Sequence, residues 1–379
     1  MPTATASTTA PSVDRLVDLT PAHRDRTVDA VRGLCIVVVV LWHWVFSITH
    51  VTASGRLSMP NPIGDVRFAW LATWVLQVMP AFFVVGGFAN LASWEGHERD
   101  GGTARGFVAG RLARLGRPVA TMALVWAVID MAGQVGFGAP SVLRWGLVVF
   151  VPLWFLGAYG AVIAVAPWTI RAHRSRPGPT FAGLLAVVAG ADALRFATGD
   201  HRWGLVTTAA VWVGAHQLGY LWRDGTIARW GRRGPVLLAA GGGLALVLLT
   251  QAGPYPASMV AVRGEALGNM FPTTAAVAAL AVTQLGLILL VRPRLERLLA
   301  RRSAWKAVVV VNATAMTVFC WHMTALVVVI GAVRAVGFEL PAHPDATWWV
   351  LRPVWLVLPG VVLLGLVKAF VRFERPSRR

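Results

Sequence analysis

The sequence predicts an all-α fold, a polytopic membrane bundle of about ten transmembrane helices. The chain has 379 residues, of which 56% are hydrophobic and only 14% are charged, whereas a soluble domain carries about 25% charged residues. Apolar stretches that reach the length of a membrane span, about 20 residues, recur along the whole chain. Each of them must be helical, because an open strand in lipid would leave its backbone polar groups unpaired.

The predicted spans follow one another with short connections and no soluble domain between them. The second is interrupted by Pro80 and by Gly86-Gly87, which would let the backbone approach a ligand or another helix closely. The fifth contains Asp192 and Arg195, whose spacing predicts an internal ion pair. The ten spans are residues 31–49, 68–92, 118–137, 145–166, 180–198, 203–222, 235–253, 271–291, 307–333 and 347–367.

The basic residues predict the topology. The formal net charge is +18, but the charges lie in short runs between apolar stretches, which argues against a nucleic-acid-binding face. With the N-terminus in the cytoplasm, every internal segment carries more Arg and Lys than its external neighbours. We therefore expect a multi-pass protein of the cell (plasma or inner) membrane with both termini cytoplasmic. Residues 1–25 are expected to be a disordered cytoplasmic tail.

A stripe of polar residues runs along the first predicted helix. Asp29 and Arg32 are three residues apart and share a helix face. His43 lies eleven residues beyond Arg32, which returns it to that face about 16 Å deeper. An ionisable group at membrane depth is a functional hypothesis by default. His is the natural general base near neutral pH, and Arg suits an anionic donor such as a phosphorylated carrier arriving from the cytosol. The alternative is an interfacial anchor with a packed histidine.

Other polar residues at membrane depth have a structural alternative of similar weight. Trp321-His322 in the ninth span and His216-Gln217 in the sixth are either functional or satisfied by packing. Glu265, in the loop after the seventh span, either contacts an acceptor or is solvated. Cys35 and Cys320 lie inside apolar runs, so neither a disulfide nor a metal site is expected. No serine-hydrolase elbow, zinc-protease motif or phosphate-binding loop is present in the sequence.

Six motifs in order carry a resemblance to a known family. They are Arg26-Thr-Val-Asp29-Ala-Val-Arg32-Gly33 followed by His43, Phe82-Phe83 to Phe88, Arg111-x-x-Arg114, Leu153-Trp154-Phe155-Leu156, Trp321-His322, and Glu374-Arg375-Pro376. In these the chain resembles the acyltransferase-3 family of integral membrane acyltransferases over residues 26–376. It departs from the family pattern at Gly86, where Ser-Gly is common, at Arg117 and at Thr324, which indicates a divergent branch.

The resemblance implies transfer of an acyl group, most simply acetyl, from acyl-coenzyme A to a hydroxyl of a glycan, lipid or secondary metabolite. It implies His43 as the catalytic base, with Asp29 and Arg32 supporting it or the donor. Arg111 and Arg114 would bind the phosphates of the coenzyme. We also expect His322, Trp154 and Glu265 to contact the substrate. The partners expected are the lipid bilayer, acyl-coenzyme A and the acceptor, with no metal and no nucleic acid.

The alternative class is a small-molecule transporter or exporter. It would share the span count, the buried histidines and the interrupted helix. Transporters often show repeated halves with matching interrupted helices, and the sequence has no clear internal repeat.

Overall fold

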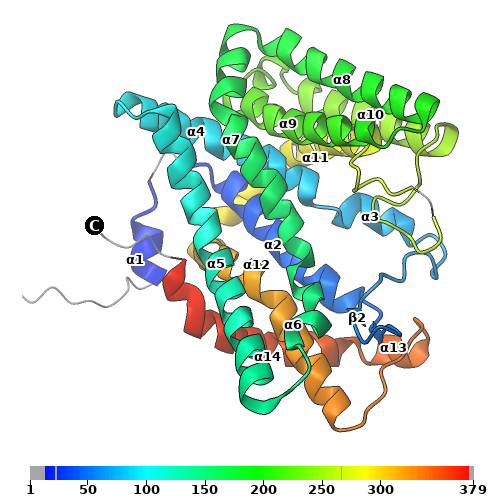
Figure 1. The fold of residues 1–379 in the computed structure, drawn as a ribbon. Coiled ribbons are helices and arrows are strands. Elements are labelled where there is room, and N and C mark those ends of the chain that lie inside the picture. Colours follow the sequence, from blue (N-terminus) through cyan, green and yellow to red (C-terminus); the bar gives the residue numbers. More distant parts are fainter. Residues whose placement is uncertain (1–12, 22–23, 266, 375–379) are drawn as a thin grey trace, which may run out of the picture.

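The computed structural model describes residues 13–21, 24–265 and 267–374. Over these residues 76% of the structure is helical, and the strands are a two-stranded antiparallel hairpin, β1 (His50–Val51) and β2 (Leu57–Ser58). The predicted all-α class is therefore confirmed. The long helices form one bundle (Figure 1).

The bundle is built from long helices with short helical pieces at their ends. In chain order they are α1 (Val13–Asp18), α2 (Arg26–Val45), α3 (Trp70–Leu76), α4 (Met79–Arg99), α5 (Ala104–Phe137), α6 (Val142–Trp145), η1 (Leu147–Leu153), α7 (Trp154–Ser175), α8 (Pro177–Thr198), α9 (Arg202–Arg223), η2 (Ala228–Trp230), α10 (Arg233–Val247), η3 (Leu248–Ala252), α11 (Ala275–Leu299), α12 (Arg302–Ala335), α13 (Ala346–Val350), α14 (Arg352–Phe370) and η4 (Val371–Phe373).

Nine helical segments within the described residues are long and apolar enough to cross a membrane. They correspond to nine of the predicted spans. The remaining one, 203–222, is the 22-residue helix α9, which is long enough but less apolar because it carries His216-Gln217. Most of its second half is buried. It packs against α4, α7, α8 and α11, so neighbouring helices rather than lipid surround its polar residues.

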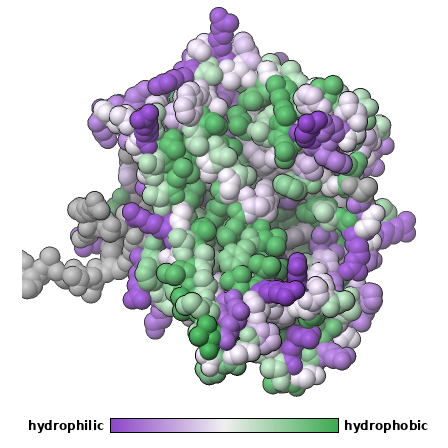
Figure 2. All heavy atoms as spheres, viewed as in Figure 1, coloured by the Kyte–Doolittle hydropathy of each residue, from purple (hydrophilic) through white to green (hydrophobic). Residues whose placement is uncertain are grey.

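Helix α2 lies at the centre of the bundle, in contact with α4, α11, α12 and α14 (Figure 1). One end of the bundle carries α1, the turn between α4 and α5, and η4; we call it the α1 side. The opposite end carries β1–β2, α13 and the loop 253–274; we call it the hairpin side. Apolar residues gather over the centre of the face in Figure 2, with many hydrophilic ones towards its margins, as expected for a bundle embedded in lipid.

Two glycines bring α4 and α9 into backbone contact. A Cβ atom at Gly87 would stand 1.9 Å from the carbonyl oxygen of His216, and one at Gly219 would stand 2.0 Å from that of Val84. No side chain fits at either position. Of the two glycines in the second predicted span, Gly87 therefore allows the close helix packing that is common in membrane proteins. A Cβ at Gly86 would instead meet the hydroxyl of Tyr159, at 2.7 Å.

The second predicted span is broken just before Pro80, between α3 and α4. The break frees backbone groups that need partners at membrane depth. The Gln284 side chain of α11 supplies two of them: its amide nitrogen donates to the carbonyl of Gln77 at 2.8 Å, and its oxygen accepts from the Ala81 N–H at 3.0 Å. The side-chain oxygen of Gln77 accepts from the Met79 N–H. The backbone groups freed by the break thus have hydrogen-bond partners, and the side chain of Gln77 lines a cavity.

The structure differs from the expected disordered tail at residues 13–18, which form α1. This helix packs on α12, with Val17 against Leu299 and Trp305. Asp14 pairs with Lys306 at 2.9 Å, and Asp18 pairs with Arg302. Disorder was expected from the composition of this segment, which has no apolar core. A six-residue helix has no stability alone, and contacts with α12 stabilise it here. Of the expected tail, residues 1–12 and 22–23 lie outside the described residues.

Candidate functional site

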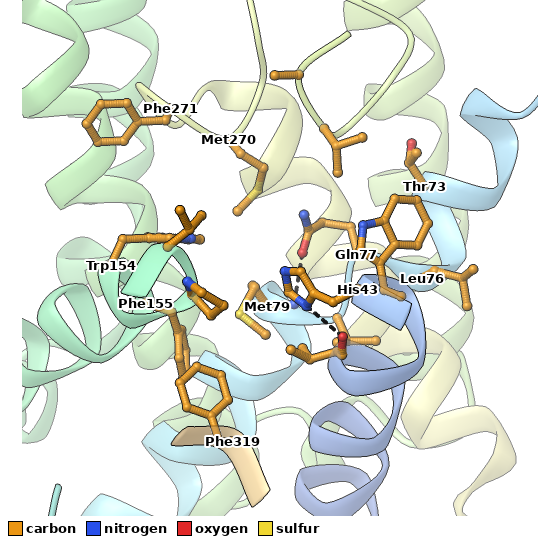
Figure 3. Close-up of a pocket in the computed structure, with 17 residues that line it drawn as sticks. His43, Thr73, Leu76, Gln77, Met79, Trp154, Phe155, Met270, Phe271 and Phe319 are labelled. Carbon is orange, nitrogen blue, oxygen red and sulfur yellow. Dashed lines mark hydrogen bonds between the residues drawn. The ribbon is translucent and has the colours of Figure 1, made fainter. Parts of the chain in front are cut away.

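A cavity of about 570 Å³ surrounds His43 on the hairpin side of the bundle (Figure 3). Helix α2 contributes His43, the α3–α4 break contributes Gln77, and the start of α7 contributes Trp154. Loop 253–274 lies over it with Met270 and Phe271. In Figure 3 the imidazole of His43 projects between the side chains of Gln77 and Trp154. These four parts of the chain, together with Phe319 of α12, form the cavity around one ionisable side chain.

The hydrogen bonds of His43 define which nitrogen faces the cavity. Its Nδ1 lies 2.8 Å from the carbonyl oxygen of Val39. A carbonyl only accepts, so Nδ1 must carry the proton and the neutral ring must leave Nε2 as an acceptor. Within the described residues Nε2 has no hydrogen-bond partner. The ring can therefore accept a proton from a molecule in the cavity.

A second histidine orients the first. His322 of α12 donates from Nδ1 to the carbonyl of Phe319 at 2.7 Å, so its Nε2 is an acceptor. That Nε2 lies 3.4 Å from Nδ1 of His43. The Nδ1–H of His43 thus meets two acceptors, Val39 O and His322 Nε2, and both favour the same tautomer. His322 is fully buried and does not line the cavity, so its contact is with His43.

An ion-pair cluster occupies the α1 side of the same helix face. Asp29 accepts from Arg32 at 3.0 Å and also pairs with Arg24. Nε of Arg32 donates to Asn312 of α12 at 2.8 Å, and the Asn312 amide donates to the backbone carbonyl of Asp29. Arg32 is thus held by one carboxylate and one amide. The expected stripe from Asp29 through Arg32 to His43 is present on α2.

Two further arginines add positive charge to this cluster. Arg111 and Arg114 of α5 lie within electrostatic range of Arg32. Arg111 contacts the carbonyl of Ala89 and the ring of Phe107, and Arg114 is exposed. Neither forms an ion pair with any residue in 13–21, 24–265 or 267–374. A cluster that contains more guanidinium groups than carboxylates is suited to binding a phosphate-bearing ligand.

The Arg32 cluster and His43 line two separate cavities. The second cavity, about 280 Å³, is lined by Arg24, Asp29, Arg32 and Asn312 together with residues of α1 and α12. The cavities share no lining residue. Phe155 and Phe319 are buried and line the His43 cavity. A ligand that bridges the two cavities must displace side chains between them.

Several residues singled out in the sequence lie elsewhere. Glu265 is exposed and does not line the cavity. The expected ion pair between Asp192 and Arg195 is wrong: Asp192 instead accepts from Thr207, from Tyr255 and from the backbone N–H of Ala275 at the start of α11. This carboxylate joins α8 to α9 and α11, and its position at a helix N-terminus is favourable for a negative charge.

His216 is likewise part of a buried packing contact. Its Nε2 lies 2.9 Å from the side-chain nitrogen of Asn90, which also reaches the hydroxyl of Tyr159 at 3.4 Å. The structural alternative for His216 is therefore the one the contacts support. Within the described residues no three His, Cys, Asp or Glu side chains group as metal ligands would.

One polar residue of the site, Gln77, escaped the sequence analysis. The amide nitrogen of Gln77 has no hydrogen-bond partner among the described residues, and the side chain lines the cavity near His43 (Figure 3). Its position in an apolar span, three residues before a proline, was the available signal. Glu374 accepts from the N–H groups of Met316 and Thr317 and from the Thr317 hydroxyl at 2.6 Å, and so ties the chain after α14 to α12. The rest of that motif, Arg375-Pro376, lies outside the described residues.

The fold and this site define a multi-pass membrane protein with a histidine-centred cavity, and the family comparison identifies the class. The model of the acyltransferase-3 family, described as an acyltransferase domain, matches residues 25–371. The chain therefore belongs to this family, as the ordered motifs predicted, and is a membrane acyltransferase in general terms. No curated protein and no solved structure matches it.

Proposed function

We propose that the protein transfers an acyl group from acyl-coenzyme A to a hydroxyl group of an acceptor, with His43 as the general base. The observation that supports the proposal is that Nε2 of His43 is free to accept a proton inside a ligand-sized cavity. The chain also belongs to a family of acyltransferases. A neutral imidazole with one free nitrogen is what deprotonation of an alcohol requires.

The reaction consists of one exchange at the thioester carbon. The acceptor oxygen attacks this carbon while its proton passes to Nε2 of His43. The carbon–sulfur bond then breaks, and the departing coenzyme A sulfur takes the proton from the imidazolium. Val39 O and His322 Nε2 both accept from Nδ1–H, and these contacts favour the imidazolium that forms in between.

The arginines would bind the donor. The phosphates of coenzyme A would contact Arg111 and Arg114, with Arg32 nearby on α2. The α1 side would then face the cytoplasm, in agreement with the positive-inside pattern, and the protein would lie in the cell membrane. The thioester reaches His43 along the face of α2 once Phe155 and Phe319 move aside.

Two side chains in the cavity are suited to the oxyanion that forms during the attack. Gln77 offers a free amide N–H, and Trp154 offers its indole N–H. Asn312 is unsuited, because its amide already donates to the carbonyls of Asp29 and Val308 in the other cavity. Donation to the developing charge in a water-poor cavity is worth several kcal/mol, about 2.7–4 for one donor in a well-studied case.

The test is acyl transfer by the full chain in liposomes. Acetyl-, propionyl- and octanoyl-coenzyme A are supplied on the α1 side, and release of the free thiol is followed with and without alcohol acceptors. Thiol release that depends on the acceptor, with the acyl ester recovered by mass spectrometry, supports the proposal. Folded protein that releases no thiol from any donor, yet moves a small molecule across the vesicle, contradicts it in favour of a transporter.

A further inference from the structure

The His43 cavity is far larger than the acetyl group it would receive. Its volume of about 570 Å³ lies within the range of drug-sized ligand sites, about 300–1,000 Å³. It therefore has room for a second, larger body next to the reacting groups.

The lining of this cavity offers few polar partners. Apolar and aromatic side chains make up most of it: Val39, Leu76, Val78, Met79, Val151, Phe155, Val260, Met270, Phe271 and Phe319. The hydroxyl of Thr73 is already committed, donating to Trp70 and accepting from Met259. His43 and Gln77 therefore remain, together with indole N–H groups.

The small number of polar groups in the lining distinguishes between two classes of acceptor. A sugar brings several hydroxyl groups, and each one buried without a partner costs about 1–3 kcal/mol. A largely apolar molecule with one reactive hydroxyl needs only the partners that His43 and Gln77 provide. The lining favours the second class.

The exposed rim of the cavity is apolar. Phe271 of loop 253–274 is 75% exposed, Val151 of η1 is 58% exposed and Trp154 is 40% exposed. Val151 and Trp154 lie at the start of a membrane-spanning segment, Leu147–Ser175. Large exposed apolar side chains around a cavity mouth at this depth suit contact with lipid rather than water.

We infer that the acceptor is a lipophilic alcohol of drug-like size that enters the His43 cavity sideways from the bilayer, between η1 and loop 253–274. The inference rests on the proposed function and names its acceptor class. We assign the cavity to the acceptor rather than to the acyl chain of the donor, because loop 253–274 of the hairpin side contributes Met270 and Phe271 to its lining, whereas Arg32 lines the separate cavity beside α1.

The test uses a photoreactive fatty alcohol, dodecanol with an aliphatic diazirine, on the full chain in liposomes. Irradiation should label the peptides that contain residues 147–155 and 270–275. Farnesol, a lipophilic alcohol, should compete, and methyl glucoside at the same concentration should not. Labelling at these peptides no higher than at lipid-facing α14, or competition by methyl glucoside alone, would overturn the inference.

Two variants make the test specific to the cavity. Val260→Trp fills it and should reduce labelling about tenfold, a loss of about 1.4 kcal/mol; the matched control Val328→Trp, on an exposed position of α12, should leave labelling unchanged. Phe271→Ser alters only the rim and should slow labelling, whereas Val361→Ser on α14 should not. Equal labelling of Val260→Trp and wild type would contradict the assignment.

Enzymatic arms separate this inference from the proposed function. His43-dependent transfer to farnesol or dodecanol with acetyl-coenzyme A supports both. Efficient transfer to methyl glucoside, unaffected by Val260→Trp, would keep the function and overturn the acceptor class. Transfer only from octanoyl-coenzyme A, and blocked by Val260→Trp, would assign the cavity to the acyl chain. Cavity labelling without any transfer would overturn the function and leave the lipophilic ligand site.

Discussion

The imidazole rings of His43 and His322 face each other across the α2–α12 contact, with 3.4 Å between Nδ1 of His43 and Nε2 of His322. Their ring centroids are 5.1 Å apart. Each ring also donates from Nδ1 to a carbonyl one helical turn earlier on its own helix. This arrangement fixes the tautomer of His43 from two directions and keeps its Nε2 directed to the cavity.

Replacing His322 should impair catalysis more than donor binding. His322→Ala removes one acceptor for the Nδ1–H of His43, so we expect kcat to fall about 10- to 100-fold, less than the full effect of general-base catalysis, with little change in KM for the donor. His322→Gln retains a side-chain acceptor and should recover part of the rate. Steady-state kinetics in liposomes measures both parameters. A purely structural role would lower the amount of folded enzyme without this recovery.

Neutralising Arg111 or Arg114 should weaken donor binding. Arg111→Gln and Arg114→Gln each remove a charged donor to phosphate, and a charge-assisted hydrogen bond is worth about 1.5–3 kcal/mol. We expect KM for acyl-coenzyme A to rise about tenfold or more, with a smaller change in kcat. Arg105→Gln, an exposed position at the start of α5, is the control. A KM for the donor that stays at the wild-type value would place the phosphates elsewhere.

The close contact of α4 and α9 should not tolerate a methyl group. Gly87→Ala forces the helices apart, because its Cβ would stand 1.9 Å from the carbonyl oxygen of His216. Overpacking of this kind costs about 1–3 kcal/mol or more. Thermal unfolding in detergent measures the loss. Gly214→Ala has no atom within 4 Å of the new Cβ and should be neutral or slightly stabilising; equal loss in both variants would show that the contact with His216 does not govern the effect.

The attachment of α1 should depend on pH and salt. The hydrogen bond from Lys306 lowers the pKa of Asp14, and that from Arg302 lowers the pKa of Asp18, both below 3.8. A lowered folded-state pKa stabilises attachment above the unfolded value and loses that contribution as the pH falls through the folded value.

Amide hydrogen exchange of residues 13–18 measures this attachment. Exchange, corrected for the intrinsic pH effect, should be slow near about pH 7 and faster near about pH 3. High salt at neutral pH should also accelerate it, because these pairs are exposed and screened. Val17→Ser should release α1 at every pH. Protection that is insensitive to both salt and acid would mean that apolar packing alone holds the helix.

Helical periodicity was enough to predict, from the sequence alone, which polar residues of α2 share one face. The spacing of Asp29, Arg32 and His43 is local to one helix, so the shared face followed from 3.6 residues per turn. His322 was recognised as a polar residue at similar depth, but its pairing with His43 depends on how α2 and α12 pack, which spacing within either helix does not determine.

The missed features have the same physical origin. Gln284 supplies hydrogen bonds to a helix break 203 to 207 residues away in the sequence, and Gln77 became part of the site only because that break directs its side chain into the cavity. The spacing of Asp192 and Arg195 suggested an ion pair, but Thr207, Tyr255 and a helix N-terminus compete more effectively for the carboxylate. Tertiary partners override local spacing wherever several donors converge.

The most direct measurement is the rate of acyl transfer by His43→Ala, compared with wild type and with His201→Ala, an exposed histidine outside the site. All three proteins are reconstituted in liposomes at matched folded amounts, and ester product is followed with acetyl-coenzyme A and a hydroxyl acceptor. The account predicts a loss of about 100-fold or more for His43→Ala and an unchanged rate for His201→Ala. Wild-type transfer by folded His43→Ala would contradict it.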